Sequence, residues 1–322
     1  MTFTPPNEQE IKEIFLRALG RDVISVRRFP TGLAHFVYDV ETDLGDFALR
    51  VARPDDFGLR AFRAAMYWSD RLRPMGIPMP EIFYDDIEAK HSRFHCYIME
   101  RFQGDDLYKV FADMNAAARE RLAEQISDIQ NKVGTLAPGR GFGCTFTPDD
   151  VDVLHASWFD YIARFDELRG RIRKAGVFSE DYVNELEAAM TAHRNYFDQI
   201  RPIPFLDDIQ GKNIIVNNRH ELSGIVDVDE IAYGDRIFNI ALTQIALMAD
   251  QTANPADYIY ALCRRADVTA EGREALRLYT MHFCVEFMSE VGHAFNKDAP
   301  APIDCARNEK LREIFVGLRA GN

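Results

Sequence analysis

The chain has 322 residues, of which 47% are hydrophobic and 28% are charged. This composition is typical of globular proteins, and the length suits two domains or one large two-lobed unit. The formal net charge is −13 and the pI is about 5.1. Because a negatively charged surface repels nucleic-acid backbones and anionic lipids, we expect neither nucleic acid nor a membrane surface as a partner.

The first part of the chain predicts a small antiparallel sheet. Residues 7–19 carry apolar side chains at helical spacing, and Gly20 follows them as a stop signal. A second helical segment, from about residue 59 to 72, separates two groups of runs rich in β-branched and aromatic residues. These runs predict five strands, at residues 23–29, 36–42, 47–52, 81–84 and 94–99.

Beyond Gly104 the pattern becomes mostly helical. The predicted helices span residues 106–113, 116–135, 158–174, 180–199, 237–249, 255–265, 270–293 and 305–318. One β-hairpin, at residues 213–217 and 222–228, interrupts them. The glycine-rich segment 138–144 is interpreted as a plain loop, since no predicted strand precedes it. We therefore expect an α+β protein with a small N-terminal lobe, residues 1–103, and a helical C-terminal lobe, residues 104–322.

Several segments bear on where the protein acts. The N-terminal sequence lacks a basic region followed by an apolar core, so we do not expect a secretory signal. The longest apolar stretch, residues 237–249, is shorter than the ~20 residues that span a bilayer. The five cysteines are scattered singly, which favours reduced thiols over a disulfide framework. A cytoplasmic location is expected.

Chemically useful side chains concentrate around the predicted hairpin. Asp208 precedes Asn213 by five residues, and Asp227 follows fourteen residues later. Phosphoryl transfer needs a carboxylate near the acceptor hydroxyl and oxygen ligands that hold Mg²⁺ against the phosphates. A loop aspartate, a loop asparagine and a strand-end aspartate would supply these groups.

At this point the chain resembles the aminoglycoside phosphotransferase and choline kinase superfamily, whose fold is protein-kinase-like. The catalytic loop of that family has the form HGDxxxxN, and Asp208 and Asn213 match its aspartate and asparagine. The resemblance implies that Asp208 is the catalytic residue and that Asn213 and Asp227 ligate Mg²⁺. It also places Asp235 at a later, structural aspartate.

The resemblance extends more weakly over most of the chain, including the small lobe. Arg50 stands where a strand residue binds the nucleotide phosphates, and Thr31 and Gly32 match the phosphate-covering hairpin. Residues 98–103 resemble the hinge between the lobes, whose backbone binds adenine. The hinge residues expected at the nucleotide are Met99, Glu100 and Arg101.

The sequence departs from the family pattern at three places. The loop histidine and glycine are replaced by Leu206 and Asp207. The helix glutamate that should face the phosphate-binding cation is missing, since Ala65 and Met66 lie near its expected place. Position 239, often aspartate in the family, is Asn239. An alternative interpretation is therefore a catalytically weak or inactive nucleotide-binding protein with this fold.

The resemblance implies a Mg²⁺-dependent enzyme that transfers the γ-phosphate of ATP, or of GTP, to a hydroxyl of a small molecule. Residues 205–235 contain seven acidic and two basic side chains, a net charge of −5. A cationic acceptor, such as an amino sugar or amino alcohol, would suit this field, although bound Mg²⁺ would neutralise much of it. The sequence leaves open the identity of the acceptor, the choice between ATP and GTP, and the oligomeric state.

Overall fold

The computed structural model describes residues 3–29, 35–53, 55–250, 253–292 and 303–320. These residues form two compact units. The first contains the described chain up to Gln103 together with Gly224–Asp229, and the second contains Gly104–Ser223 and the described chain from Glu230 onward. The first is built around an antiparallel sheet and the second is mainly helical, so the predicted α+β class is confirmed.

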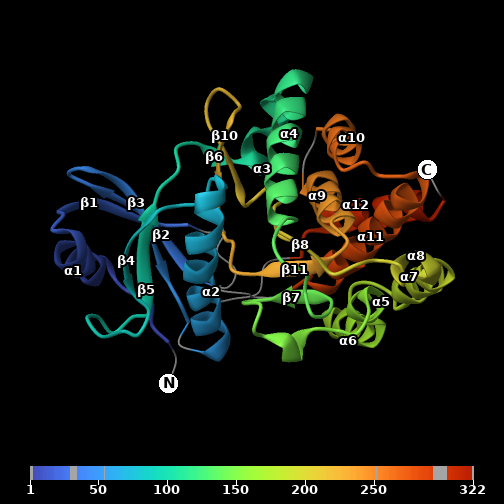
Figure 1. Ribbon diagram of the computed structural model, residues 1–322, viewed down its shortest axis with the longest axis horizontal. Coiled ribbons are helices and arrows are strands. Elements are labelled where there is room, and N and C mark those ends of the chain that lie inside the picture. Colours follow the sequence, from blue (N-terminus) through green and yellow to red (C-terminus); the bar gives the residue numbers. More distant parts are fainter. Residues whose placement is uncertain (1–2, 30–34, 54, 251–252, 293–302, 321–322) are drawn as a thin grey trace. The chain divides into compact units, whose positions relative to one another are not determined.

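The sheet of the first unit has five antiparallel strands in the order β1-β2-β3-β5-β4 (Figure 1). All five were predicted, and their ends differ from the prediction by at most two residues. The strands are β1 (Val23–Arg28), β2 (Phe36–Thr42), β3 (Gly45–Val51), β4 (Ile82–Asp86) and β5 (Cys96–Glu100).

Each face of this sheet packs against one helix. Helix α1 (Glu8–Leu19) contributes its apolar stripe to one face, and helix α2 (Asp56–Leu72) packs on the other and leads into the 3₁₀ turn η1 (Arg73–Met75). Each helix forms an apolar cluster with the sheet, here called the α1 cluster and the α2 cluster. Because successive side chains of a strand point to opposite faces, the two clusters share strands but no residues. The α2 cluster contains Phe62, Ala65 and Tyr97.

A short segment from the hairpin region packs with the first unit. The amide of Ile225 donates a hydrogen bond to the carbonyl of Pro78, at 2.9 Å. Gly224 lies against the ring of Phe102, and a Cβ at this position would come within 2.2 Å of the ring. The segment Gly224–Asp229, which carries Asp227, therefore belongs to the first unit.

Helices dominate the second unit (Figure 1). Two long predicted helices are each divided, because α5 ends at Ile162 and α7 ends at Ala192 before a new helix begins. The helical elements are α3 (Leu107–Val110), η2 (Phe111–Asp113), α4 (Ala116–Val133), η3 (Val151–Val153), α5 (Trp158–Ile162), α6 (Phe165–Ala175), α7 (Asp181–Ala192), α8 (Arg194–Phe197), α9 (Ile237–Asp250), α10 (Ala256–Arg265), α11 (Ala270–Ser289) and α12 (Cys305–Arg319).

Two small sheets accompany these helices. The hairpin strands β9 (Ile214–Val216) and β10 (Leu222–Ile225) were predicted, and β6 (Asp105–Asp106) joins them in the order β10-β9-β6. The second sheet, with the order β7-β11-β8, was not predicted. Its strands are β7 (Gly143–Thr145), β8 (Ile203–Phe205) and β11 (Ile231–Gly234), so the expected plain loop at residues 138–144 ends in a strand.

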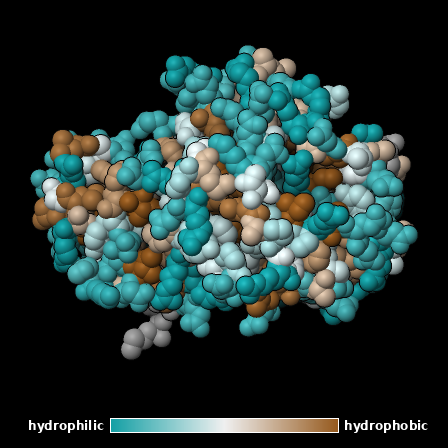
Figure 2. All heavy atoms as spheres, viewed as in Figure 1, coloured by the Kyte–Doolittle hydropathy of each residue, from teal (hydrophilic) through white to brown (hydrophobic). Residues whose placement is uncertain are grey.

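Within the second unit, α9 packs against α11, and α10 packs against α4. Hydrophilic residues cover most of the face shown in Figure 2, and apolar residues appear there in small groups. None of the described helices combines the length and apolar character needed to cross a bilayer.

Candidate active site

A buried arginine lies in the middle of the five-stranded sheet. Arg50 of β3 stands directly opposite Tyr97 of β5. Its neighbours Leu49 and Val51 belong to the α1 cluster, so strand alternation points Arg50 to the α2 face. The guanidinium lies 5.7 Å from the ring centroid of Phe62. Only 5% of Arg50 is exposed, so its charge requires partners inside the unit.

Two aspartates and a tyrosine provide these partners. Asp229 accepts two parallel hydrogen bonds from the guanidinium of Arg50, at 2.9 and 2.8 Å, and Asp227 forms a further ion pair with it. Arg50 also donates to the hydroxyl of Tyr97, at 2.9 Å. Burial alone would lower the pKa of Arg50, but the carboxylates of Asp227 and Asp229 raise it well above its ordinary value. Arg50 is therefore a fixed cation.

The bidentate bond to Asp229 explains how Arg50 is held without a helix glutamate. Ala65 and Met66 of α2, near the position where that glutamate was sought, belong to the apolar cluster on this face. Asp229 instead reaches Arg50 from a position 179 residues further along the chain. Because the planar fork of arginine matches a carboxylate, this pair fixes the orientation of the guanidinium as well as its position.

His35 lies beside the same ion pair. Its Nε2 atom is 3.8 Å from a carboxylate oxygen of Asp229, and the side chain is buried. Burial, followed by the charge of Arg50, lowers the pKa of His35 to about 3. The imidazole is thus neutral at physiological pH.

Asp227 combines an accessible carboxylate with an unusual backbone. Its side chain is 44% exposed, whereas the side chain of Asp229 is 14% exposed. The φ angle of Asp227 is 65°, in the left-handed region that aspartate tolerates better than most residues. Such backbone conformations concentrate at functional sites, where the surrounding structure imposes them. Asp227 is therefore the carboxylate of this group best placed to accept a ligand.

The second unit holds the loop that contains Asp208. Three neighbouring side chains contact its carboxylate: Asn213 donates to Oδ2 at 2.8 Å, Gln210 donates to Oδ1 at 3.3 Å, and the Nζ atom of Lys212 lies 3.5 Å from Oδ2. The side chain of Asp208 is nevertheless 40% exposed. The loop therefore orients a carboxylate that solvent or a substrate can still reach.

Tyr108 supports this loop from α3. Its hydroxyl donates to Oε1 of Gln210 at 2.6 Å, which turns the amide nitrogen of Gln210 toward Asp208. The backbone of Gly211 packs on the ring of the same tyrosine, where a Cβ would lie only 2.4 Å from ring carbons. Glycine is needed here because of this close approach. The sequence spacing alone did not predict a role for Tyr108, Gln210 or Lys212.

Asn213 offers a single type of atom to a ligand. Its amide nitrogen donates to the backbone carbonyl of Asp208 at 2.9 Å and to the carboxylate of Asp208 at 2.8 Å. Both amide hydrogens are thus directed to Asp208, so Oδ1 is the atom that Asn213 can offer to a cation. Asn213 is buried, and the contacts with Asp208 set its orientation.

A thiol and two carboxylates, those of Cys144, Asp207 and Glu230, lie close together next to the loop that contains Asp208. Cys144 of β7 donates to the carboxylate of Asp207 at 2.9 Å and lies 3.1 Å from the hydroxyl of Tyr161. Ligand atoms of Cys144, Asp207 and Glu230 lie within 4.8 Å of one another. Burial and then the charge of Asp207 raise the pKa of the Cys144 thiol well above its usual value. The protonated thiol therefore acts as a hydrogen-bond donor to Asp207.

The pKa of Asp207 predicts a pH-dependent stability. Burial raises it from 3.8 to about 6, and the charge of Asp208 adds to this against the hydrogen bond from Cys144. Below pH about 4 the carboxyl is protonated in both the folded and the unfolded chain, so its burial as a charge does not lower the free energy of unfolding. Above pH about 6 it is ionised in both, and the folded state carries the full penalty.

We therefore expect Asp207→Asn to raise the free energy of unfolding at pH 8 by about 1–3 kcal/mol, with a difference that shrinks toward pH 4. Urea unfolding at pH 4, 6 and 8 measures this. Glu221→Gln, an equivalent change at an exposed carboxyl, is the control. A stabilisation that does not vary with pH would show that the penalty at Asp207 does not come from its charge.

The sequence matches a known protein family over most of its length. The family model named APH, Phosphotransferase enzyme family, matches residues 25–279. The chain belongs to this family. No curated protein matches the sequence at a significant level.

Solved structures with the same fold include other family proteins. The apo form of a thermostable mutant of aminoglycoside phosphotransferase APH(4)-Ia is 16% identical, with a TM-score of 0.67 over 96% of this chain and 99% of that one. A putative fructosamine-3-kinase from Thermobifida fusca YX-ER1 is 18% identical, with a TM-score of 0.63 over 98% of this chain and 100% of that one. The GDP complex of an aminoglycoside 2′-phosphotransferase-IIIa mutant is 16% identical, with a TM-score of 0.68 over 98% of each chain. The protein-kinase-like fold is thereby confirmed.

Five further residues were predicted at the nucleotide site. Thr31 and Gly32 fall outside the described residues. Met99 and Glu100 belong to β5, where the amide of Glu100 already donates to the carbonyl of Glu81 at 2.7 Å. Arg101 follows β5, and its Nε atom donates to the carboxylate of Asp39 at 3.1 Å.

Asp235 has a structural role in this family member. It is buried and accepts hydrogen bonds from the hydroxyls of Tyr196 and Tyr279, at 2.9 and 3.0 Å, and from the amide of Ile237, at 3.0 Å. Burial raises its pKa, and these donors oppose that rise. Asp235 therefore ties the start of α9 to α8 and α11.

Proposed function

We propose that this protein is a small-molecule kinase that transfers the γ-phosphoryl group of ATP, or of GTP, to a hydroxyl of a small molecule with the help of Mg²⁺. The observation that carries the proposal is the loop geometry. Asp208 is oriented by Asn213 and Lys212, yet remains accessible, in a chain that matches the phosphotransferase family over residues 25–279.

In this reaction Asp208 positions the acceptor hydroxyl and accepts its proton. Phosphoryl transfer has little covalent chemistry for the protein to perform, so orientation of the attacking oxygen is a main contribution. The carboxylate is held from both oxygens, by Asn213 on one and Gln210 on the other. It therefore needs little rearrangement when the acceptor binds.

The residues proposed as magnesium ligands carry oxygen atoms of the kind that Mg²⁺ prefers. Mg²⁺ prefers oxygen ligands and is usually bound in such enzymes by one or two carboxylates together with substrate phosphates. Asn213 can offer only its amide oxygen, because its two amide hydrogens are directed to Asp208. Asp227 offers a partly exposed carboxylate. Bound there, Mg²⁺ would neutralise charge that develops on the phosphates.

The nucleotide is proposed to bind to the N-terminal lobe, residues 1–103. Arg50 would hold the phosphates, and Asp229 would keep its guanidinium oriented by the bidentate bond. The backbone of Thr31 and Gly32 would cover the phosphates, and Met99, Glu100 and Arg101 would contact the adenine. The C-terminal lobe, residues 104–322, would carry the catalytic loop and the acceptor site.

The acceptor is proposed to be an alcohol, and charge favours a cationic one. The net charge of −5 over residues 205–235 includes Asp207, whose carboxylate adjoins the catalytic aspartate. Two solved structures with this fold were determined as ternary complexes, one with AMP-PNP and hygromycin B and one with streptomycin and ATP. We therefore rank aminoglycoside-, choline- and sugar-like alcohols first as acceptors. We also propose that the protein acts in the cytoplasm.

The proposal is tested in two steps. First, melting temperatures are measured with ATP or GTP, with and without MgCl₂, and a metal-dependent rise is expected. Second, ADP release is followed across a library of amino sugars, amino alcohols and sugars, with the phosphorylated product identified by mass spectrometry. The alternative, an inactive nucleotide-binding protein, would instead be supported if the nucleotide binds but no ADP is released. This result requires that ADP is absent both with every acceptor and in a long incubation without acceptor.

Arg50 yields a prediction about nucleotide affinity. Arg50→Lys keeps the charge but loses the fork that bonds to Asp229, so we expect MgATP affinity to fall about tenfold, and Arg50→Ala to weaken it further. Calorimetric titration with MgATP measures both. Arg27→Ala, at a cation of β1 whose side chain is 73% exposed, is the matched control. Unchanged affinity in folded Arg50→Lys and Arg50→Ala would place the phosphate ligand elsewhere.

A further inference from the structure

The catalytic loop is attached to the helical core by the side chain of a buried glutamine. Gln130 of α4 donates from Nε2 to the carbonyl of Leu206, at 2.7 Å, and accepts at Oε1 from the amide of the same residue, at 3.0 Å. One side-chain amide thus satisfies both polar backbone groups of Leu206. This pairing resembles that of two strands in a sheet, with a side chain in place of the second backbone.

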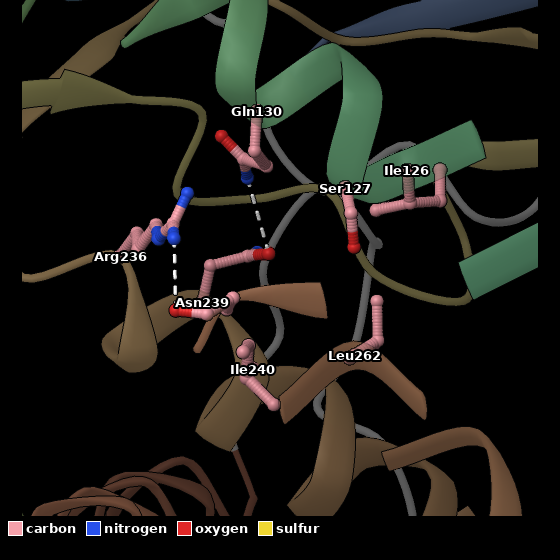
Figure 3. Close-up of a pocket in the computed structure, with 8 residues that line it drawn as sticks. Ile126, Ser127, Gln130, Arg236, Asn239, Ile240 and Leu262 are labelled. Atoms are coloured by element: carbon pink, nitrogen blue, oxygen red, sulfur yellow. Dashed lines mark hydrogen bonds between the residues drawn. The ribbon is translucent and has the colours of Figure 1, made fainter. Parts of the chain in front are cut away.

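Asn239 of α9 extends the same set of contacts. Its Nδ2 atom donates to the carbonyls of Asp207 and Ile209, at 2.7 and 3.2 Å, and its Oδ1 accepts from Nε2 of Gln130, at 3.3 Å. Figure 3 shows the two amides pointing toward each other, with the hydrogen bond between them dashed. Thr243 adds a hydroxyl that donates to Ile209, at 3.2 Å. We call Gln130 and Asn239 the amide clamp.

The clamp holds the backbone on both sides of Asp208. The carbonyls that accept its hydrogen bonds belong to Leu206 and Asp207 before the aspartate and Ile209 after it. Leu206 is 2% exposed, so its backbone groups need partners from the protein. Its own side chain cannot supply a hydrogen bond. With the two residues before Asp208 and the one after it fixed, the direction of the Asp208 side chain is restricted.

The neutrality of the clamp suits the charges nearby. Asp207 and Asp208 are adjacent carboxyls, and the charge of Asp208 already contributes to the raised pKa of Asp207. A carboxylate at position 239 would add a third negative charge and would lack donors for two carbonyls. An amide supplies these donors without charge. The pair Gln130 and Asn239 therefore compensates for Leu206, which stands where the family has a bracing histidine.

We propose that Gln130, together with Asn239, is a positioning residue that sets Asp208 for phosphoryl transfer. This inference rests on the proposed function and deepens it, because it names the groups that act through the catalytic aspartate. Neither side chain contacts Asp208 itself among the hydrogen bonds of the described residues. Their effect should therefore appear in turnover and in loop exchange rather than in nucleotide binding.

The test compares Gln130→Met, Asn239→Leu and the double variant, which replace the amides by apolar side chains of similar size. We expect kcat to fall about tenfold or more in each single variant, with KM for ATP changed by less than about twofold. Because the two amides are bonded to each other, the double variant should fall by clearly less than the product of the two single effects. Thr243→Val, which removes one outer contact, should give a smaller loss of the same kind.

Two further measurements keep the result interpretable. Ser127→Ala changes a buried residue on the same helix and in the same small pocket as Gln130, and kcat should stay unchanged (Figure 3). Hydrogen–deuterium exchange of the Leu206 amide should be about tenfold faster in Gln130→Met, whether or not any acceptor is turned over. That readout separates failure of the clamp from failure of the proposed function. Folded clamp variants with lower melting temperatures but wild-type kcat and wild-type exchange at Leu206 would overturn the proposal.

Discussion

Asp208→Asn is expected to lower the rate of phosphoryl transfer by a factor on the order of 10² or more, the range that a general base supplies. The variant keeps the size of the side chain but removes the group that accepts the proton of the acceptor hydroxyl. The affinity for MgATP should remain nearly unchanged, because the proposed ligands of the phosphates and the metal are other residues, and Asn213 keeps its hydrogen bond to the backbone carbonyl of Asp208. Single-turnover assays and calorimetry measure the two quantities separately.

The substitution Asp208→Asn also changes contacts within the loop, so a control variant is needed. Asn213 and Lys212 both approach the carboxylate, so an amide in its place loses the ion pair with Lys212 and must rearrange its contact with Asn213. Glu221→Gln, an acid-to-amide change at an exposed residue that follows the same loop, should leave turnover unaltered. Wild-type turnover in purified, folded Asp208→Asn would remove Asp208 from the catalytic role.

Elements with a strong local pattern were predictable from the sequence. Five strands with β-branched and aromatic runs appeared within two residues of their predicted bounds. Strands β7, β8 and β11 were missed because each has only three or four residues and, unlike β9 and β10, none is joined to its partner strand by a short turn. Their pairing depends on contacts between segments far apart in sequence, such as Ala232 opposite both Cys144 and Phe205.

The same distinction applies to the candidate site. The spacing of Asp208 and Asn213 is local, and the structure places the two side chains in contact. The partner of Arg50 was sought on the neighbouring helix, near Ala65, whereas the structure supplies Asp229 from the far end of the hairpin. A sequence pattern identifies the residue types that a site needs, but a distant residue can provide the same charge.

The role of Gln130 could not be predicted from the helical pattern of α4. A polar residue in an amphipathic helix is ordinarily assigned to the solvent side. Gln130 is 8% exposed because its amide replaces a backbone partner for Leu206. Only the fold brings α4 to Leu206 in the loop that contains Asp208. The leucine at position 206 was visible in the sequence, but the hydrogen bonds between its backbone and Gln130 were not.

The response to MgATP should disappear in Asp227→Ala. At a nucleotide concentration of about 100 times Kd, a bound ligand stabilises the folded state by about 2.7 kcal/mol, which appears as a rise in melting temperature. Asp227 is proposed as a metal ligand, so the variant should melt at the same temperature with ATP alone and with ATP plus Mg²⁺. Wild-type protein under both conditions is the reference.

The apo protein tells whether Asp227 is strained. In Asp227→Asn the loss of the ion pair with Arg50 opposes the relief of repulsion with Asp229. Because Arg50 keeps its bidentate bond to Asp229, the apo variant should melt close to the wild-type temperature. Alanine tolerates the φ of 65° less well than asparagine, so Asp227→Ala should melt below Asp227→Asn by the equivalent of about 1 kcal/mol. A purely structural aspartate predicts the opposite pattern: both apo variants destabilised, with the Mg²⁺-dependent shift intact. A preserved metal-dependent shift in Asp227→Asn and Asp227→Ala would therefore exclude Asp227 from the metal site, whatever the apo melting temperatures are.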